Sequence, residues 1–477
     1  MNTQFELAII GGGTAAITAA MRALECGAKS IAIIEGRRTL GGECALNACV
    51  PSKTLLTAVK LWNVLHEKSA DYGLEIAPKK INFQHLMEKV DEVIAEGDNP
   101  FEHDSRVTVI NDYACFMDPD TLLLQQSQEH LKAERYLIAT GSSARKLTIP
   151  GAEEVGYMTF QQASHLKELP KSMAILGAGP VGVEFCYIFA SLGVQVTLLH
   201  KDATLLPHEE PEVQTAVMEL LHKLGVHIVT DANLVKLTQG ETGNRKCVHF
   251  KTQSGTAQSL EIEEILSAVG MHPNIERLGL EVADIQANPE KGIVVTPDMQ
   301  TTNPKVWAIG DVVGHFGFTH IADYQAEIAA ENALSHAHKH VDYTGIAWAL
   351  YTDPAISHVG LTEAEAREQY AEVDTILCST AEVSRYRIES ELDGFIKLVI
   401  DRQTHDILGG HIFASEAEEL AHVLSLAIRQ RMTCELLLNS MFYIYPCRMQ
   451  LIQKALERYL APCHQPGTLE SRLIGAR

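Results

Sequence analysis

Apolar residues along the chain are grouped in short runs that end in glycines and are followed by longer, helix-like segments. The first run, Phe5-Glu6-Leu7-Ala8-Ile9-Ile10, leads directly into Gly11-Gly12-Gly13. A helix-like segment from Ile17 to Leu24 comes next, and Ser30 to Ile34 has the pattern of a second strand. Strand, glycine turn, helix and strand in this order are typical of a parallel, doubly wound sheet, so the pattern predicts an α/β fold.

The first glycine turn has the features of a dinucleotide-binding fingerprint. Gly11 permits the tight turn, Gly13 lets the backbone approach a pyrophosphate, and Ala16 allows the helix to pack closely on the strand. The N-terminus of the helix attracts the phosphate charge. The second strand ends in Glu35, whose carboxylate would hold a ribose hydroxyl. This unit is therefore predicted to bind a dinucleotide.

The same unit recurs later in the chain. The longest apolar region, Ser172 to Leu199, is interrupted by four glycines, so it predicts a buried strand, turn, helix and strand rather than a membrane span. Its turn contains Gly177, Gly179 and Gly182 in the fingerprint pattern. One chain is therefore expected to hold two dinucleotides.

The second unit differs from the first at the end of its second strand. His200 and Lys201 stand where the first unit has an acid, so groups that can accept a 2′-phosphate replace a carboxylate that would repel it. NADPH is therefore expected at this site. NADH is the alternative, because Asp202 follows immediately and the two basic residues can also form an ordinary solvated turn.

Cys44 and Cys49 lie in the run Gly41-Gly42-Glu43-Cys44-Ala45-Leu46-Asn47-Ala48-Cys49-Val50-Pro51-Ser52-Lys53. Two thiols at this spacing can switch between a disulfide and a dithiol. Residues five apart on a regular helix point about 140° away from each other, since each residue turns about 100°, so the pair can bond only across an irregular turn. Pro51 suits the first position of the following apolar helix. The cysteines are then expected at a helix N-terminus, which favours thiolate.

Two dinucleotide sites that flank a redox-active cysteine pair imply an electron relay. A nicotinamide would give hydride to a flavin, and the flavin would pass electrons to the disulfide. FAD and NADPH are the cofactors that this hypothesis requires. The protein would orient them while they react.

Composition narrows the class of protein. A chain of 477 residues is expected to form two to four domains, and its formal charge of −22 argues against nonspecific binding of nucleic acid or of an anionic membrane. The first strand begins almost at Met1 and leaves no room for a signal peptide, so a cytoplasmic location is expected. Ten dispersed cysteines favour reduced thiols over a disulfide framework. Five are expected to be small buried or half-buried side chains: Cys26, Cys115, Cys186, Cys247 and Cys378.

Nearly the whole chain resembles the flavin-dependent pyridine nucleotide-disulfide oxidoreductases, the family of dihydrolipoamide dehydrogenase, glutathione reductase and mercuric reductase. The likeness rests on the two fingerprints and on the Gly-Gly-x-Cys-x4-Cys-x-Pro-Ser-Lys segment. Further family motifs follow in order: Ala139-Thr140-Gly141-Ser142, Gly270 with Pro273-Asn274, Thr301-Thr302-Asn303-Pro304, Ala308-Ile309-Gly310-Asp311, and Thr352-Asp353-Pro354 before Val359-Gly360-Leu361-Thr362.

The resemblance implies roles for the residues at the family positions. Cys49 would lie against the flavin, and Cys44 would attack the substrate. Lys53 and Glu184 would form an ion pair near the flavin ring, where a positive charge favours reduced, anionic flavin. Asp311 would bind the ribityl chain of FAD. The other cofactor-binding residues that it implies are Gly42, Thr140, Gly141, Gly270 and Gly310.

The resemblance also implies two Rossmann-like dinucleotide-binding domains and a C-terminal α+β dimerisation domain. A FAD-binding domain would span residues 1–150 and an NAD(P)H-binding domain residues 151–268. Residues 269–338 would return to complete the FAD domain, and residues 339–477 would form the dimerisation domain. The expected macromolecular partner is a second copy of the chain, with no nucleic acid and no membrane.

The chain departs from dihydrolipoamide dehydrogenase and glutathione reductase near its C-terminus. In those relatives a His-Pro, followed four residues later by Glu, shuttles protons for the dithiol across the dimer interface. Here the matching residues are Tyr445, Pro446 and Gln450. A phenol with an ordinary pKa of about 10 is a poor proton shuttle at pH 7 compared with an imidazole at about 6.5. Ordinary disulfide reductase activity is therefore not expected.

Mercuric reductase resembles this chain in having a tyrosine at the histidine position. A metal ion captured by thiolates needs no base to protonate a leaving sulfur, and soft thiolates suit soft metals. Mercuric reductase also has two adjacent cysteines near its C-terminus, and this chain has instead the separate Cys447 and Cys463. Cys447, two residues after Tyr445, is the stronger candidate for an extra ligand.

The leading hypothesis is an FAD-dependent NAD(P)H oxidoreductase, mercuric reductase-like, that reduces a metal ion or another thiol-reactive electrophile through Cys44 and Cys49. No resident metal site is expected. One alternative is a dihydrolipoamide dehydrogenase-like or glutathione reductase-like enzyme in which His422 or His464 replaces the missing histidine. An alternative of another class is a flavoprotein that does not turn over and serves as a redox sensor.

Overall fold

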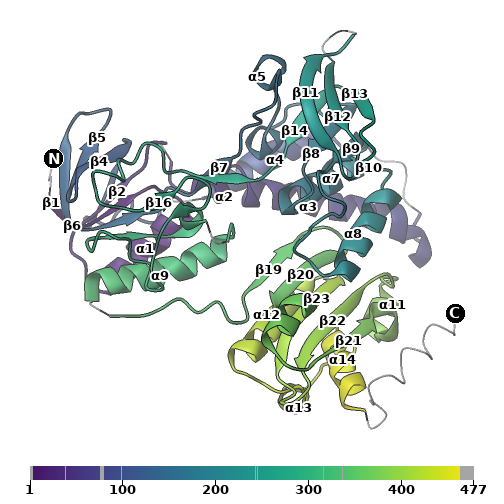
Figure 1. The fold of residues 1–477 in the computed structure, drawn as a ribbon. Helices are drawn as coiled ribbons and strands as arrows, with labels where there is room; N and C mark the ends of the chain where they lie inside the picture. Colours follow the sequence, from purple (N-terminus) through teal and green to yellow (C-terminus); the bar gives the residue numbers. More distant parts are fainter. Residues whose placement is uncertain are drawn as a thin grey trace.

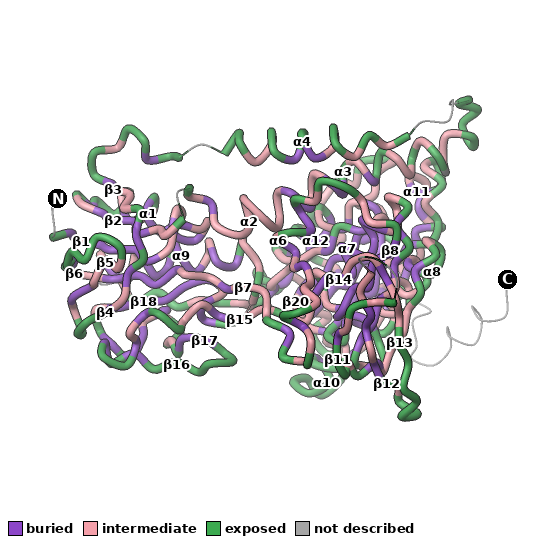
Figure 2. The backbone as a smooth tube through the Cα atoms, turned by 90° about the horizontal axis from the view of Figure 1, so that it is seen from above, coloured by how far each residue is buried: buried purple, intermediate pink, exposed green. Residues whose placement is uncertain are grey.

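The computed structural model describes residues 4–461, except residues 38, 76–79, 98, 242, 244, 315 and 336. The chain forms three lobes, and each lobe is built around its own β-sheet (Figure 1). We name them the N-terminal lobe, with strand β1, the middle lobe, with β8, and the C-terminal lobe, with β20. Buried residues follow these sheets (Figure 2). No helix in the described ranges is long and apolar enough to cross a membrane.

The sheet of the N-terminal lobe has the strand order β3-β2-β1-β6-β5-β4, and β18 pairs with β6. Strands β3, β2, β1, β6 and β18 are parallel, while β4 and β5 are antiparallel to their neighbours. Parallel strands are usually buried on both faces, which explains the unbroken apolar runs. The strands are β1 (Gln4–Ile10), β2 (Ile31–Ile34), β3 (Val107–Ile110), β4 (Ala114–Asp118), β5 (Thr121–Leu124), β6 (His130–Ile138) and β18 (Val306–Ala308).

Helices α1 (Thr14–Glu25) and α9 (Thr319–Ser335) pack side by side in the N-terminal lobe although they lie far apart in the sequence. Both bury alanines at the contact, since small side chains let two helix backbones approach closely. The hydroxyl of Thr18 donates to Asp323 across this contact, at 3.0 Å. The late segment of the chain therefore completes the lobe that the first segment begins.

The middle lobe repeats the parallel unit in the strand order β10-β9-β8-β14. The region expected to form a buried strand, turn, helix and strand consists of β8, α7 and β9, which confirms that prediction. The strands and helices of this unit are β8 (Ser172–Leu176), α7 (Pro180–Ser191), β9 (Gln195–Leu199), α8 (Pro211–Lys223), β10 (His227–Val229) and β14 (Glu264–Ser267). A separate antiparallel sheet consists of β11 (Asn233–Gln239), β12 (Lys246–Lys251) and β13 (Ala257–Ile262).

The C-terminal lobe has a five-stranded antiparallel sheet in the order β19-β20-β23-β22-β21. Helix α12 packs against β20 and β23, and α14 packs against β21 and β22. The elements are β19 (Ala347–Leu350), β20 (Ala355–Gly360), α10 (Glu363–Gln369), β21 (Val373–Ser379), η4 (Thr380–Glu382), α11 (Ser384–Ile388), β22 (Phe395–Asp401), β23 (Ile407–Ala414), α12 (Ala417–Arg429), α13 (Cys434–Asn439) and α14 (Gln450–Leu460).

Further segments connect the lobes. A two-stranded ribbon of β7 and β15 carries the chain between the N-terminal and middle lobes. These segments are α2 (Gly42–Leu46), α3 (Cys49–Asn63), η1 (Val64–Lys68), η2 (Ser69–Tyr72), α4 (Phe83–Ala95), β7 (Ser142–Ala144), α5 (Ala152–Val155), α6 (Phe160–Ala163), β15 (Met271–Pro273), β16 (Ala287–Asn288), β17 (Gly292–Ile293) and η3 (Gly310–Val313).

The predicted α/β class and the strands and helices of both fingerprints are confirmed, while one helix start was wrong by two residues. Helix α3 begins at Cys49, so Pro51 is its third residue and not its first. The first four N–H groups of a helix have no partner inside the helix, so proline is tolerated anywhere in the first turn. The domain boundaries stay a prediction.

Gly182 holds α7 against the glycine turn of the middle lobe. A Cβ atom at this position would lie 2.0 Å from the carbonyl oxygen of Gly177. The helix can sit this close to the turn only because the side chain is absent. Gly179, by contrast, has no heavy atom within 4 Å of a built Cβ.

Gly182→Ala is therefore expected to destabilise the middle lobe by about 1–3 kcal/mol, because helix and turn must move apart. The apparent Tm, followed by circular dichroism, should fall. Gly179→Ala is the matched control and should leave the Tm nearly unchanged. Equal Tm values for the two variants would contradict this account of the packing.

Candidate active site

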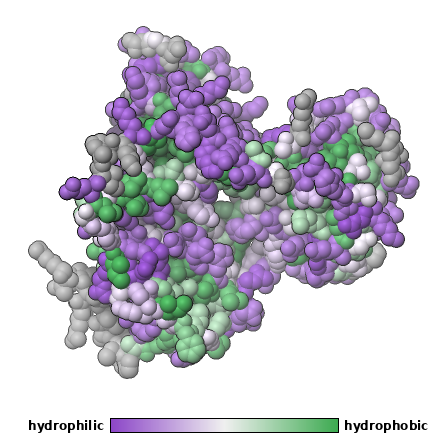
Figure 3. Space-filling view, turned by 180° about the vertical axis from the view of Figure 1, so that it is seen from behind, coloured by the Kyte–Doolittle hydropathy of each residue, from purple (hydrophilic) through white to green (hydrophobic). Residues whose placement is uncertain are grey.

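A cleft of about 800 Å³ lies where the three lobes meet, and its lining comes from all three. The surface is hollowed at this meeting point (Figure 3). Many residues predicted from the sequence line it: Gly11, Gly13, Glu35, Gly42, Cys44, Cys49, Lys53, Thr140, Gly141, Glu184, Gly310 and Asp311. Ala16, Gly177, Gly179, Gly182, His200, Lys201, Gly270 and Tyr445 are not part of this lining.

The first glycine turn lies at the carboxyl ends of the parallel strands, where α/β sheets bind ligands. Gly11 has φ +110°, and a Cβ there would lie 2.3 Å from the carbonyl oxygen of Ala139. Glu35 accepts hydrogen bonds from the backbone N–H groups of Gly12 and Arg37, each at 2.7 Å. The carboxylate thereby fixes the turn as well as standing at the predicted ribose position.

The start of α2 presses against the same turn. Gly42 has φ +62°, and a Cβ there would lie 2.7 Å from Cα of Gly13. Gly141, with φ +66°, has no atom within 4 Å of a built Cβ, so a side chain there would take up cleft space. Backbone is thus exposed along the cleft where an extended dinucleotide needs close approach.

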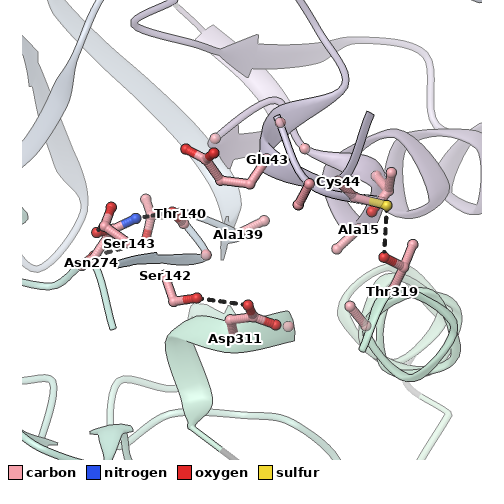
Figure 4. Close-up of a pocket in the computed structure, with 18 of the residues that line it drawn as sticks. Ala15, Glu43, Cys44, Ala139, Thr140, Ser142, Ser143, Asn274, Asp311 and Thr319 are labelled. Carbon is pink, nitrogen blue, oxygen red and sulfur yellow. Dashed lines mark hydrogen bonds between the residues drawn. The ribbon is translucent and has the colours of Figure 1, made fainter. Parts of the chain in front are cut away.

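Asp311, on η3, is a half-buried acid of the cleft. The hydroxyl of Ser142 donates to its carboxylate at 2.7 Å, and burial raises the pKa of Asp311 (Figure 4). Thr140 donates to the carbonyl oxygen of Asn274 at 2.9 Å, which joins two family motifs far apart in sequence. A half-buried carboxylate acceptor beside bare backbone fits the hydroxyl-rich chain of FAD, so these residues suit that cofactor.

Cys44 and Cys49 lie on different helices that are separated by a sharp break. Cys44 is on α2, Cys49 is the first residue of α3, and the backbone between them leaves helical geometry at Asn47 and Ala48. This is the irregular turn expected from the spacing. Both thiols are free and half-buried. The prediction of a shared helix N-terminus is wrong, because only Cys49 begins a helix longer than two turns.

Thr319, the first residue of α9, bridges the two sulfurs. Its hydroxyl lies 3.0 Å from Sγ of Cys44 (Figure 4). The same hydroxyl lies 3.7 Å from Sγ of Cys49. A hydrogen bond from Cys44 lowers the pKa of Cys49 to about 6, against the opposing effect of burial, and Thr319 and Lys53 lower it further. The same hydrogen bond, with burial, raises the pKa of Cys44. The pair therefore holds one thiolate, on Cys49, near neutral pH.

Lys53 and Glu184 form an ion pair, with Nζ 3.0 Å from both carboxylate oxygens. Burial alone would lower the pKa of Lys53, but the Glu184 carboxylate overcomes it and the net shift is upward. Tyr351 joins them: its backbone N–H donates to Oε1 of Glu184 at 3.0 Å, and its ring centroid lies 4.7 Å from Nζ of Lys53. A permanent positive charge is therefore fixed beside the thiols.

In the middle lobe, His200 occupies the place that Glu35 has in the first unit. Its Nδ1 accepts a hydrogen bond at 3.2 Å from the backbone N–H of Ala178, in the glycine turn. Burial lowers the pKa of His200, so the ring is neutral at pH 7. Lys201 is 76% exposed and pairs with Asp202 at 3.1 Å. Of the two basic residues, only Lys201 presents a charge at the strand end.

Tyr445 lies away from the cleft of its own chain. Its side chain is exposed and its hydroxyl lies 3.4 Å from Oγ of Ser384. Phe442 and Ile444 beside it are also exposed, so an apolar loop between α13 and α14 faces outward. Cys447 is half-buried. The candidates Cys463 and His464 lie outside the described residues, and His422 is exposed on α12.

One further prediction was wrong. Cys26 is exposed, because it ends α1 as its C-cap, whereas Cys186, Cys247 and Cys378 are buried and Cys115 is half-buried.

Sequence reasoning missed two residues that touch the key side chains, Thr319 and Tyr351. Thr319 precedes His320, whose Nε2 lies 2.7 Å from the carbonyl oxygen of Ala347. Tyr351 directly precedes the Thr352-Asp353-Pro354 motif. The sequence offered one signal for these two residues, their position next to a family motif. Only the fold shows which sulfur and charged groups they contact.

Comparison with protein families gives two matches that together span most of the chain. The family described as pyridine nucleotide-disulphide oxidoreductase matches residues 5–326, and the dimerisation domain of the same family matches residues 346–456. The second match covers the strands of the C-terminal lobe and the exposed loop before α14.

Individual relatives agree with this assignment. The mercuric reductase of Staphylococcus aureus is 32% identical over 444 residues, which cover 91% of this chain and 79% of that protein. The dihydrolipoyl dehydrogenase of Bacillus subtilis (strain 168) is 30% identical over 444 residues, which cover 90% of this chain and 92% of that protein. The Cu(II) complex of the HOCl-induced flavoprotein disulfide reductase RclA from Escherichia coli has a TM-score of 0.85 at 25% identity and covers 96% of this chain and 100% of that chain. The chain thus belongs to the pyridine nucleotide-disulphide oxidoreductases, enzymes that bind FAD and NAD(P)H and use a redox-active disulfide.

Proposed function

We propose that this enzyme uses NADPH to reduce a thiophilic metal ion, or another thiol-reactive electrophile, at Cys44 and Cys49. The observation that carries the proposal is the thiol pair itself, with a stabilised thiolate on Cys49 at a half-buried position in the cleft. Two sulfur ligands on one side of a cleft suit a soft metal ion.

Bound FAD would supply the two-electron connection between the reduced nicotinamide and the cysteine pair. The residues that would hold it are Gly11, Gly13, Glu35, Gly42, Thr140, Gly141, Gly310 and Asp311. Lys53 would hold a positive charge beside the ring, where it favours negative charge on reduced flavin. Glu184 and Tyr351 keep the ammonium group in place. The hydroxyl of Thr319 would stabilise negative charge on the sulfurs by hydrogen bonding.

Tyr445 supports a metal or electrophile over an ordinary disulfide. Reduction of a disulfide releases thiolates that must be protonated, and a phenol serves that step poorly at pH 7. The E. coli neighbour RclA has been obtained as a Cu(II) complex, so a protein of this fold can hold a metal ion.

A homodimer would complete the site. The loop with Phe442, Ile444 and Tyr445 is apolar and exposed, and an exposed apolar patch of this kind is typical of an interface. We infer that a second copy covers this loop and that Tyr445 of each protomer approaches the partner's cysteines, as the family resemblance implies. Cys447, two residues further, would then be near enough to serve as an additional ligand.

NADPH is favoured over NADH by Lys201. The neutral, buried His200 holds the turn and contributes no charge, so the exposed ammonium group of Lys201 is the group offered to a 2′-phosphate. Asp202, which pairs with Lys201, would weaken this preference.

The second candidate is a dihydrolipoamide dehydrogenase-like disulfide reductase, favoured by the 30% identity to the Bacillus subtilis enzyme over most of both chains. His422 on α12 would have to replace the missing histidine. A redox sensor of another class would keep the thiols but show no steady turnover with any acceptor.

An acceptor screen should separate these functions. With NADPH as the reductant, the wild type should turn over faster with Hg²⁺ than with the disulfides lipoamide or glutathione disulfide, and Cys44→Ser should lower Hg²⁺ reduction by about 10³-fold, as removal of a nucleophile does. Cys378→Ser removes a thiol of the C-terminal lobe that does not line the cleft, and it is the matched control. Efficient reduction of lipoamide would instead favour the second candidate, and no turnover with any acceptor would favour the sensor.

The thiolate of Cys49 should titrate with a midpoint near pH 6, present above this pH and lost below it, because its pKa is lowered to about 6. Ultraviolet difference absorbance of the reduced protein, with Cys49→Ser as the subtraction, measures the midpoint. Thr319→Val removes a hydrogen bond and should raise the midpoint by about one pH unit. Thr54→Val is the control. The hydroxyl of Thr54 donates to the carbonyl oxygen of Val50, so its removal should not change the midpoint. A wild-type midpoint at the ordinary thiol value would contradict the assignment.

Lys201→Ala should raise KM for NADPH about tenfold, because a charged hydrogen-bond partner is lost, and should leave KM for NADH nearly unchanged. Lys171→Ala, at an exposed lysine of the same lobe, is the control. Steady-state kinetics with both coenzymes decide the point. An equal rise of KM for NADPH and for NADH would show that Lys201 does not select the 2′-phosphate.

A further inference from the structure

A row of ring and amine side chains crosses the sheet of the C-terminal lobe, and none of these side chains is part of the cleft lining. The strand register places Trp348 of β19 opposite His358 of β20, His358 opposite His411 of β23, and His411 opposite Lys397 of β22. Cross-strand neighbours share one face of a sheet. All of these side chains except that of Trp348 are buried, and His411 is 0% exposed.

The acidic segment before α8 of the middle lobe packs onto this row. Glu209 accepts a hydrogen bond from Nε1 of Trp348 at 2.9 Å, and its Oε2 lies 2.9 Å from Nδ1 of His358. Glu210, next in sequence, accepts from Nζ of Lys397 at 2.8 Å. Two lobes are therefore joined through charged and polar groups that are hidden from solvent.

The hydrogen bonds of the two histidines leave a site for a cation. Nε2 of His358 lies 3.0 Å from the carbonyl oxygen of Gly360, which can only accept a hydrogen bond, so Nε2 must carry a hydrogen. Nδ1 of the same ring faces the carboxylate of Glu209, which also can only accept. Nε2 of His411 likewise donates to the carbonyl oxygen of Leu361 at 3.0 Å, and its buried Nδ1 has no hydrogen-bond partner among the described residues. A second proton or a metal ion must separate His358 from Glu209.

We propose that Glu209, His358 and His411 bind one first-row divalent metal ion, with Zn²⁺ as the reference case. One ligand atom from each lies within 4.8 Å of the other two, and imidazole with carboxylate is a common donor set for zinc. With metal–ligand bonds of about 2.0–2.2 Å, the 2.9 Å between Glu209 and His358 corresponds to an angle of about 90° at the ion. If the Glu209 oxygen and the His358 nitrogen move apart by a few tenths of an ångström, the angle at the ion becomes tetrahedral.

The charges around the site also favour a divalent cation. The carboxylates of Glu210, Glu212 and Glu363 all contact Lys397 within 3 Å, and Glu209 lies beside them. Among the described residues, the fixed cations paired with these four acids are Lys397 and Arg367, which contacts Glu363 at 2.7 Å. The surplus is two negative charges, the charge that one divalent ion neutralises. Glu209 and Glu210 are buried while Glu212 and Glu363 are partly exposed, and the buried part of this negative charge is costly without a counter-ion.

The ion would act as a structural clamp. It would join the segment before α8 to β20 and β23, and none of its ligands lines the cleft, so its binding does not depend on the proposed reductase chemistry. Because the ligands are buried, the metal would enter during folding and would exchange slowly. Sequence reasoning predicted no metal site, since Glu209, His358 and His411 are widely separated in sequence.

The test uses the full chain with Cys44→Ser and Cys49→Ser, which removes the thiol pair that would otherwise bind soft metals. Protein produced in medium with Zn²⁺ and then dialysed against a chelator should retain about one zinc per chain by plasma mass spectrometry. Glu209→Gln and His411→Gln, each in this background, should reduce the retained zinc at least about fivefold. His405→Gln, at an exposed histidine–glutamate pair in the same lobe, is the matched control and should retain it.

X-ray absorption of the zinc-loaded background protein makes the test independent of whether the variants fold. A nitrogen and oxygen shell with two imidazoles supports the site. A background protein that retains no zinc, a sulfur shell, or zinc that Glu209→Gln and His411→Gln retain as fully as His405→Gln would overturn the proposal. A failure here would leave the acceptor screen unaffected, so the two proposals can fail separately.

Discussion

One carboxylate joins the middle lobe, the connecting helix α3 and the C-terminal lobe. Glu184 is on α7 of the middle lobe, its ion-pair partner Lys53 is on α3, and the backbone N–H of Tyr351, which also binds it, follows β19 of the C-terminal lobe. A buried charge is tolerated only where such partners surround it, and removal of one partner leaves the other charge unpaired. This contact therefore holds the middle and C-terminal lobes against α3 at the edge of the cleft.

The chemistry of the thiol pair is likewise set by a few charged and hydrogen-bonding groups. Cys49 begins a helix, Thr319 begins another, and Lys53 lies one helical turn after Cys49, so hydrogen-bond donors and positive potential converge on one sulfur. The break between α2 and α3 lets Cys44 face the same point from a different direction. The asymmetry between two chemically identical thiols therefore arises from backbone geometry.

Much of the fold could be predicted because each Rossmann-like unit is encoded locally, as a strand, a glycine turn and a helix in immediate succession. The residues Thr319, Tyr351 and Glu209 could not be assigned, since their partners lie on other lobes and hundreds of positions away in some cases. The start of α3 was misplaced because proline is compatible with several positions in a first turn. Cofactor and catalytic roles came from family motifs, and these roles stay predictions.

The two glycine turns are held by the same backbone contact with different chemistry. A carboxylate oxygen of Glu35 accepts from the turn in one unit, and a ring nitrogen of His200 accepts from it in the other. What the turn requires is therefore a lone pair at the strand end and not a negative charge. The net charge at this position can change during evolution or by design while the turn keeps its shape, which separates coenzyme choice from the integrity of the fold.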